Sequence, residues 1–264
     1  MKHFRSRMLA LVVLFVAVAM LASAQGLFTE TKTSGGPLGD KTFTGQTYYM
    51  PKMFKNISAQ TGVMIFRLDK QKIYEVNDAD KTYAEITFDE WEAAMKKAAA
   101  KTDAAMGDLQ KKLEGMPKEQ REMLEKMMGD KAKGSGGGKI EVKPTSDKKT
   151  VCGLSATKVI VQQDGKDMLT LWVSKDLIGI STLKKDYEDF SRRMLAASPG
   201  GMRNLADAFA KIDGYPVSTE VMGVTTEAVK IEKKSIASSE FEVPSGYKKV
   251  PSKILAQIDS TPEK

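Results

Sequence analysis

The dipeptide Asp164-Gly165 constrains the fold more than any other part of the sequence. It stands between two stretches rich in β-branched and large apolar residues, and Asp-Gly in that setting is a strong signal for a two-residue β-turn. The turn predicts that Val161 lies opposite Met168. It also predicts that Val159 lies opposite Thr170. Because both faces of this hairpin carry apolar groups, we expect one face to meet helices and the other a second layer or a ligand.

Hydrophobic periodicity divides the rest of the chain into strands and helices. Alternation predicts strands in the first third, helical spacing follows, and the pattern then returns to strand, helix and strand. The predicted strand regions are 27–33, 44–50, 62–68, 72–76, 81–86, 139–183, 215–222 and 224–233, and the predicted helical regions are 88–131 and 184–213. This order is typical of an α+β fold.

The helical region 88–131 predicts a helical hairpin inserted between strands. Thr87 or Asp89 is suited to cap its start, and Pro117 is suited to begin its second helix. Residues 133–139 are rich in glycine and predict a flexible linker. This segment is not a phosphate-binding loop, because Ile140 stands where that motif requires Ser or Thr.

The first residues are typical of a secretory signal peptide. Basic residues precede an uninterrupted apolar run at 8–21, and Ala22-Ser23-Ala24 supplies the small residues of a cleavage site. We therefore expect cleavage after Ala24, a signal peptide at 1–24 and a single domain at 25–264. The localisation predicted is periplasmic or secreted, with at most peripheral membrane contact.

Cleavage would remove the only histidine, His3, and with it Ser-His-Asp and Cys-His mechanisms and histidine-ligated zinc. Three basic residues would leave as well, which lowers the formal net charge from +7 to +4. No basic stripe with interleaved aromatic residues is present, so we expect no nucleic-acid partner. Cys152 stands alone in the sequence and is expected to be a small buried hydrophobe.

The other motifs and acidic residues that could indicate catalysis or metal binding are better explained as chance matches or structural features. Ser-x-x-Lys, the motif of penicillin-recognising enzymes, occurs four times in this lysine-rich chain without its partner motifs. The acidic residues Asp186, Glu188 and Asp189 are expected on a solvated helix start, and residues 77–80 in a polar turn. We therefore expect no enzyme, no catalytic residue, no metal and no cofactor.

Methionine is the informative excess in composition. The chain has 16 methionines, three of them in the signal peptide, and six lie in the helical insert. They are interpreted as core filler, as an adaptable apolar surface for varied partners, or as thioether ligands of Cu(I). The last hypothesis is the weakest, because no histidine or cysteine lies near them in the sequence.

Three segments of the C-terminal third resemble the family of exported bacterial proteins known as domain of unknown function 4412. They are residues 171–176, 214–217 and 241–249, and residues 81–83 fit the same pattern. Where that family often has Gly-x-x-Cys, this chain has Ala156, and its cysteine stands at position 152 instead. These motifs identify a family and not a site.

The layout is also distantly similar to the lipoprotein carriers LolA and LolB. Residues 48–54 resemble their strand–Pro–aliphatic–Phe segment, and residues 241–246 resemble their closing strand. Met50 stands where the carriers have an arginine before that proline. The resemblance implies an α+β fold with a strongly curved antiparallel sheet, an open half-barrel with helices packed in its concavity. It also implies lipid or a lipidated protein as partner.

Alternation places Met64, Phe66 and Leu68 on one side of their strand, and Val63 and Ile65 on the other. The larger trio is predicted to line a concave apolar site. The complete predicted lining is Met64, Phe66, Leu68, Trp91, Met95, Met106, Leu169 and Leu171.

Three functions follow as hypotheses. The first is a non-catalytic cell-envelope binding module for an apolar ligand. The second is a structural or interaction protein of the envelope, with a filled core and no small ligand. The third is an enzyme of unknown type, which would require carboxylates that converge in a pocket.

Overall fold

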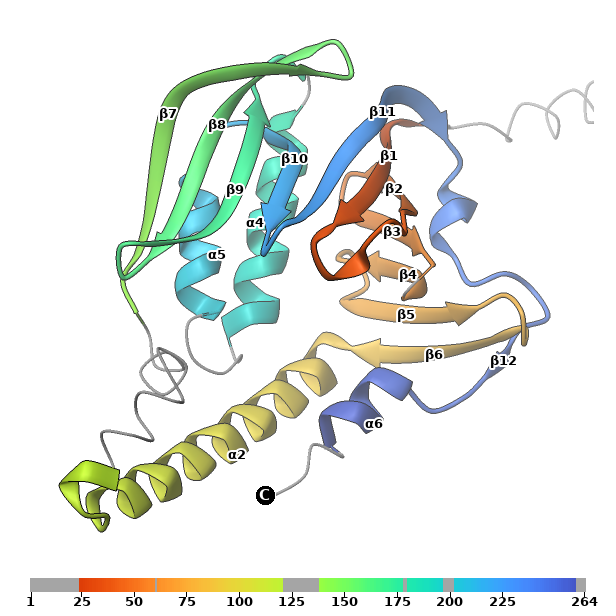
Figure 1. Ribbon diagram of the computed structural model, residues 1–264. Helices are drawn as coiled ribbons and strands as arrows, with labels where there is room; N and C mark the ends of the chain where they lie inside the picture. Colours follow the sequence, from red (N-terminus) through yellow and green to blue (C-terminus); the bar gives the residue numbers. More distant parts are fainter. Residues whose placement is uncertain (1–23, 60, 121–137, 178–179, 197–201, 260–264) are drawn as a thin grey trace, which may run out of the picture.

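A computed structural model describes residues 24–59, 61–120, 138–177, 180–196 and 202–259 (Figure 1). The predicted signal peptide up to residue 23, and most of the second half of the helical insert with its linker, lie outside these residues. The elements are β1 Ala24–Gly35, η1 Gly36–Leu38, β2 Phe43–Met50, β3 Met53–Ser58, β4 Gly62–Arg67, β5 Lys72–Asn77, β6 Thr82–Thr87, α2 Phe88–Glu114, β7 Ile140–Val151, β8 Leu154–Gln163, β9 Lys166–Ser174, α4 Ile180–Ala196, α5 Met202–Ala210, β10 Tyr215–Val221, β11 Val224–Ile236, η3 Ser238–Phe241, β12 Lys248–Lys249 and α6 Lys253–Asp259.

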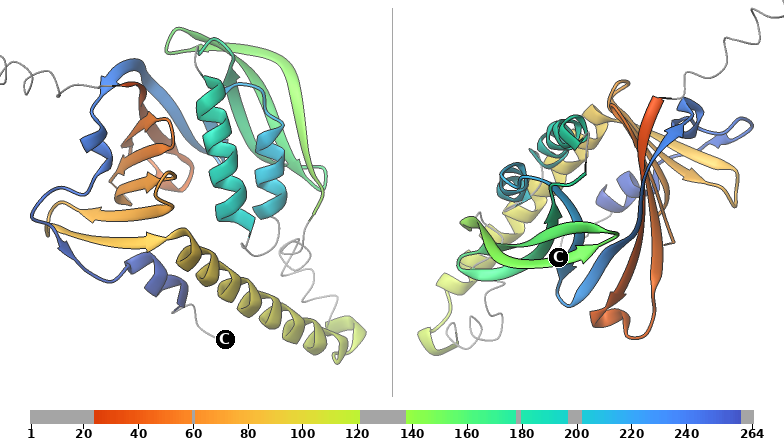
Figure 2. Two further views of the ribbon diagram at one scale, coloured as in Figure 1. Left: turned by 180° about the vertical axis from the view of Figure 1, so that it is seen from behind. Right: turned by 90° about the horizontal axis from the view of Figure 1, so that it is seen from above.

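The strands form one 12-stranded sheet in the order β12-β6-β5-β4-β3-β2-β1-β11-β10-β9-β8-β7. All pairs are antiparallel except the short pair between β12 and β6. The α+β class is therefore confirmed. The sheet is open, neither closed nor strongly curled, so the expected strongly curved half-barrel is not what forms. Helices α4 and α5 stand side by side against one face of the sheet (Figures 1 and 2).

The first six strands form an antiparallel meander. The sequence pattern predicts no strand between residues 50 and 62, but β3 forms there. Pro51 and Lys52 instead form a two-residue turn, in which Lys52 has a φ of 62°, and Met50 pairs with Met53 across it. A proline stops one strand without preventing an immediate return, because turn positions need no backbone donor.

The β8–β9 hairpin contains the predicted turn, but the predicted register is wrong. Gln163 pairs with Lys166 as a two-residue turn requires, but Val161 pairs with Leu169 rather than with Met168. Met168 is thus the extra residue of a β-bulge. The bulge shifts β9 by one position, and this brings its apolar residues onto the helix side of the sheet. The resulting buried cluster contains Val159, Val161, Leu169, Leu171, Val173 and Ile212.

Helix α2 begins as its sequence predicts. The Thr87 side chain accepts a hydrogen bond from the Glu90 backbone N–H, and the Glu90 carboxylate accepts one from the Thr87 backbone N–H, which completes a capping box. The helix ends at Glu114, with Gly115 as its C-cap, and residues 118–120 are helical again after Pro117. The far half of α2 extends away from the sheet (Figure 1). No helix in the described ranges is long and apolar enough to cross a membrane.

The segment 238–249, here called the C-terminal strap, crosses the sheet face opposite to α4. Residues 241–246 were expected to form a closing strand, but the strap begins as the short helix η3 and pairs only at β12. Arg67, which is 7% exposed, ties the strap down through an ion pair to Glu242 and a hydrogen bond to the Phe241 carbonyl. It also forms an ion pair with Asp69 in the loop after β4. The Arg67 hydrogen bond is the main cause that lowers the pKa of Asp69.

Gly214, at the entry to β10, is a position that only glycine fits. Its φ is +131°, and an added Cβ would lie 2.6 Å from the Val173 side chain and 2.7 Å from the Ser174 carbonyl oxygen. We therefore expect Gly214→Ala to lower the free energy of unfolding by about 1–3 kcal/mol, measured by urea denaturation. The matched control is Gly107→Ala in helix α2, where open space surrounds the glycine. This control should leave stability unchanged or raised by up to about 1 kcal/mol, and equal effects of both substitutions would contradict the argument.

Candidate apolar binding site

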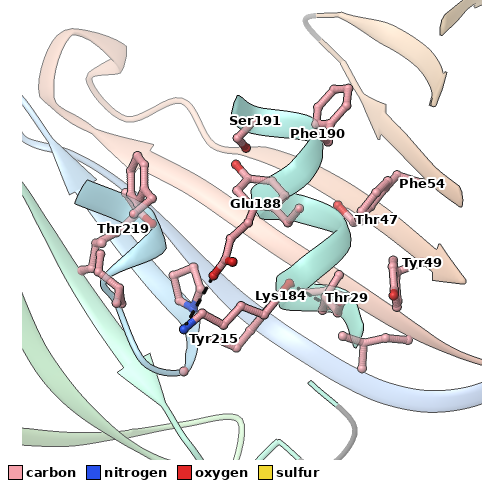
Figure 3. Close-up of a pocket in the computed structure, with 18 of the residues that line it drawn as sticks. Thr29, Thr47, Tyr49, Phe54, Lys184, Glu188, Phe190, Ser191, Tyr215 and Thr219 are labelled. Carbon is pink, nitrogen blue, oxygen red and sulfur yellow. Dashed lines mark hydrogen bonds and ion pairs between the residues drawn. The ribbon is translucent and has the colours of Figure 1, made fainter. Parts of the chain in front are cut away.

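A pocket of about 620 Å³ lies between the sheet and the helices α4 and α5 (Figure 3). Its floor comes from strands β1 to β4, and its walls come from the two helices and from β10. The lining residues are Leu27, Thr29, Thr47, Tyr49, Phe54, Asn56, Phe66, Leu171, Leu183, Lys184, Tyr187, Glu188, Phe190, Ser191, Ala206, Phe209, Ala210, Ile212, Gly214, Tyr215, Pro216, Thr219 and Thr226.

Strand register divides the pocket floor into two rows. Leu27 pairs with Tyr49, Tyr49 with Phe54 and Phe54 with Phe66, which makes an apolar row across four strands. Residues that face each other across antiparallel strands lie about 4.5–5.5 Å apart at Cβ, so this row is continuous. The rings of Tyr49 and Phe54 are 5.1 Å apart.

The second row is polar and runs beside the first. Thr29 pairs with Thr47, and Thr47 pairs with Asn56. Thr29 is buried, and its hydroxyl lies 3.4 Å from the Tyr215 hydroxyl. The floor thus offers hydrogen-bonding groups to one side of the apolar row.

Helix α4 forms one wall, and Phe190 is its main apolar contact with the floor. The Phe190 ring lies 5.1 Å from Phe66 in an edge-to-face arrangement. It lies 6.3 Å from Phe54 and 6.0 Å from Phe88. Such aromatic contacts add about 0.5–1.5 kcal/mol beyond their buried area, so they hold the helix at a defined distance from the sheet.

Asp186 fixes α4 to the sheet from within the fold. Its carboxylate accepts a hydrogen bond of 3.0 Å from the Tyr49 hydroxyl and one of 2.6 Å from the Lys52 backbone. Burial and then the Asp186 carboxylate raise the pKa of Tyr49 well above its usual range. The expectation that Asp186 is a solvated helix residue is wrong, because it is 7% exposed. The only local hint was its place next to the apolar stripe of its helix.

Two charged side chains reach the pocket, and they pair with each other. The Lys184 ammonium and the Glu188 carboxylate are 3.7 Å apart, one helical turn along α4. Both are about one-third exposed, so this pair contributes little to stability. It does, however, leave the charges at the site balanced.

The structure distributes the predicted lining residues over two neighbouring regions. Phe66 and Leu171 line the pocket. Met64, Leu68 and Trp91 pack in the adjacent cluster with Ile73, Ile86, Phe88 and Met194.

The remaining predicted lining residues lie away from the pocket. Leu169 packs against α5. Met95 is half-buried on α2, and Met106 belongs to the distal part of α2, where its side chain is not described. The residues that prediction missed are those of α4, α5 and the polar row.

The structure corrects the expectation for Cys152, which is exposed in the turn between β7 and β8. Its thiol lies 3.0 Å from the Ala228 carbonyl oxygen. Partial desolvation and then the Glu227 carboxylate raise the pKa of Cys152, which disfavours the reactive thiolate. In the described part of the chain no group of three or more acidic, histidine or cysteine side chains could hold a metal ion.

Residues 118–247 match the family model described as Domain of unknown function (DUF4412). The match covers just under half of the chain. The segments 171–176 and 214–217, from which the resemblance was inferred, lie inside the match, whereas residues 81–83 lie before it. The DUF4412 match contains both helical walls of the pocket and β10, while the floor strands β1 to β4 precede it. No curated protein matches the chain.

Several solved structures are similar to this chain. PNGF-II has a TM-score of 0.38 at 10% identity, over 89% of this chain and 32% of its own. MucB of Pseudomonas aeruginosa, solved with MucA, has a TM-score of 0.38 at 7% sequence identity. The similarity covers 86% of this chain and 59% of the MucB chain. A LolA superfamily protein from Nitrosomonas europaea has a TM-score of 0.26 at 6% sequence identity. The similarity covers 84% of this chain and 91% of that protein's chain. The chain thus spans about a third of PNGF-II and less than two thirds of MucB, and similarity at these scores says nothing about a ligand.

Proposed function

We propose that this chain is an exported, non-catalytic protein of the cell envelope that binds an apolar ligand beneath α4 and α5. The observation that carries the proposal is the pocket of about 620 Å³, lined mainly by aromatic and aliphatic side chains. Its volume lies within the range of small-molecule sites, about 300–1,000 Å³. Space of this size favours a ligand over a filled core, because protein interiors have few voids larger than a water molecule.

The proposed ligand is a lipid or the acyl chain of a lipidated partner. Phe66 and Leu171 would touch it directly, and Met64, Leu68 and Trp91 would support the floor from the adjacent cluster. The described residues that line the pocket are mainly aromatic and aliphatic, which suits the binding of an apolar group. Export belongs to the same proposal, with a leader of residues 1–24 removed after Ala24. One domain at 25–264 would remain, with its helical insert at 88–131 and linker at 133–139.

The test introduces large side chains from helix α5 into the pocket. Ala206 and Ala210 both line it, and neither is fully buried in the packed core. We expect wild-type protein to bind phenylnaphthylamine, an uncharged fluorescent apolar probe. Ala206→Phe and Ala210→Phe should each weaken that binding by about tenfold or more, a loss of about 1.4 kcal/mol, because the new ring takes the space of the probe.

The matched control is Ala104→Phe, which adds the same ring at an exposed position of α2 and should bind the probe as the wild type does. Fluorescence titration gives the affinities, and circular dichroism checks that each variant is folded. Absence of binding by the wild type would contradict the proposal and favour an envelope interaction protein with a filled core. Unchanged binding by both folded α5 variants would place the probe elsewhere and would also contradict it.

A further inference from the structure

The polar row on the pocket floor is ordered by the sheet. Thr29, Thr47 and Asn56 are consecutive cross-strand partners on β1, β2 and β3. Adjacent strands lie about 4.8 Å apart, so the row places three hydrogen-bonding side chains across roughly 10 Å of floor. Figure 3 shows Thr29 and Thr47 on the sheet side of the pocket, opposite the helix that carries Glu188.

These side chains have hydrogen-bonding capacity to spare. Within the described residues, no side-chain hydrogen bond joins Thr47 or Asn56 to another residue, and neither is among the fully buried polar groups without a partner. Their polar atoms therefore face open space in the pocket. Thr29 and Tyr215 share a single long hydrogen bond, and since each hydroxyl carries one proton, one of the two remains able to donate.

The charge balance of the pocket determines which polar group fits best. Among the described residues that line the pocket, the only charged ones are Lys184 and Glu188, and they neutralise each other. An anionic or cationic ligand would lose hydration at the site without gaining an unpaired counter-charge. A neutral group that accepts or donates hydrogen bonds would instead find partners along the polar row.

We propose that the ligand is an uncharged amphipath, such as a long-chain acyl ester of glycerol. Its chain lies along the apolar row from Leu27 to Phe66, and its ester and hydroxyl groups bond to Thr29, Thr47 and Asn56. This inference rests on the proposed function and adds the class of ligand to it. It assigns specificity to the polar row, which a site for hydrocarbon alone would not need.

The experiment displaces phenylnaphthylamine from the full chain with three ligands of equal chain length: a monoacylglycerol, the free fatty acid and the hydrocarbon. We expect the monoacylglycerol to bind about tenfold more tightly than either of the others, the gain of one or two net hydrogen bonds. Thr29→Val and Thr47→Val should each reduce the ratio of monoacylglycerol to hydrocarbon affinity by about threefold to tenfold.

The control is Thr44→Val, the same substitution on the same strand at an exposed position. Thr44 faces away from the pocket, because it stands three positions before Thr47 on the same strand and side chains alternate between the two faces, so the wild-type ratio should be kept. Three outcomes would overturn the inference: equal affinities for the three ligands, tightest binding of the fatty acid, or an unchanged affinity ratio in both pocket variants. Each of them would still be consistent with an apolar binding site. Failure of the probe and of all three ligands to bind would overturn both.

Discussion

Phe241→Ala should lower the free energy of unfolding by about 3–5 kcal/mol, the usual cost of truncating a buried aromatic residue. Phe241 has no exposed surface at all, and it carries the C-terminal strap onto the sheet face opposite to α4. Loss of its ring would leave a cavity that the strap cannot fill, since Arg67 holds the Phe241 backbone. The cluster it enters contains Met50, Ile65, Tyr74, Val76 and Ile236.

Chemical denaturation of the wild type and the variant measures this effect. Met222→Ala is the control, because Met222 is 89% exposed at a turn and its truncation should change stability by less than about 0.5 kcal/mol. A loss below about 1 kcal/mol for Phe241→Ala would show that the strap is not part of the cooperative core. Probe binding should persist in folded Phe241→Ala protein, since Phe241 lies on the face away from the pocket.

Asp186→Ala should cost about 3 kcal/mol, because two hydrogen bonds to a buried carboxylate are lost at about 1.5 kcal/mol each. The Tyr49 hydroxyl and the Lys52 backbone N–H would both lose their acceptor. Since α4 carries one wall of the pocket, affinity for an apolar probe should fall as well. Asp189→Ala, at an exposed position of the same helix, should affect neither property.

A double-mutant cycle with Tyr49→Phe isolates the side-chain bond. The Phe substitution alone should cost about 1–2 kcal/mol, and a coupling of about 1 kcal/mol with Asp186→Ala is expected, because the pair shares one bond. Additive effects would contradict the contact.

The pH dependence gives a second check on Tyr49. Its pKa is raised in the folded state, so its contribution to stability is complete below the unfolded value of about 10 and is lost as the pH rises above it. Tyr49→Phe should therefore reduce the alkaline loss of stability.

Local sequence determined the parts of this protein that depend on neighbouring residues. The capping box of Thr87 and Glu90 involves atoms three residues apart, and the turn at Asp164-Gly165 requires only that both residues accept a positive φ. Alternation likewise predicted that Met64 and Phe66 lie on the face opposite to Ile65, and the structure places them in different clusters. Each of these features follows from backbone geometry over a few residues, so a pattern in the sequence suffices.

Only the tertiary structure decided the register of β9, the burial of Asp186 and the pocket. The bulge at Met168 forms because it places Leu169, Leu171 and Val173 on the face that packs against α5, where their burial is favourable. Local turn rules do not include the free energy of that packing. The pocket joins floor strands that end at Arg67 to helices that begin at Ile180. It exists because β11 returns to pair with β1, and the free energy of such distant contacts comes from shared burial, which no short stretch of sequence specifies.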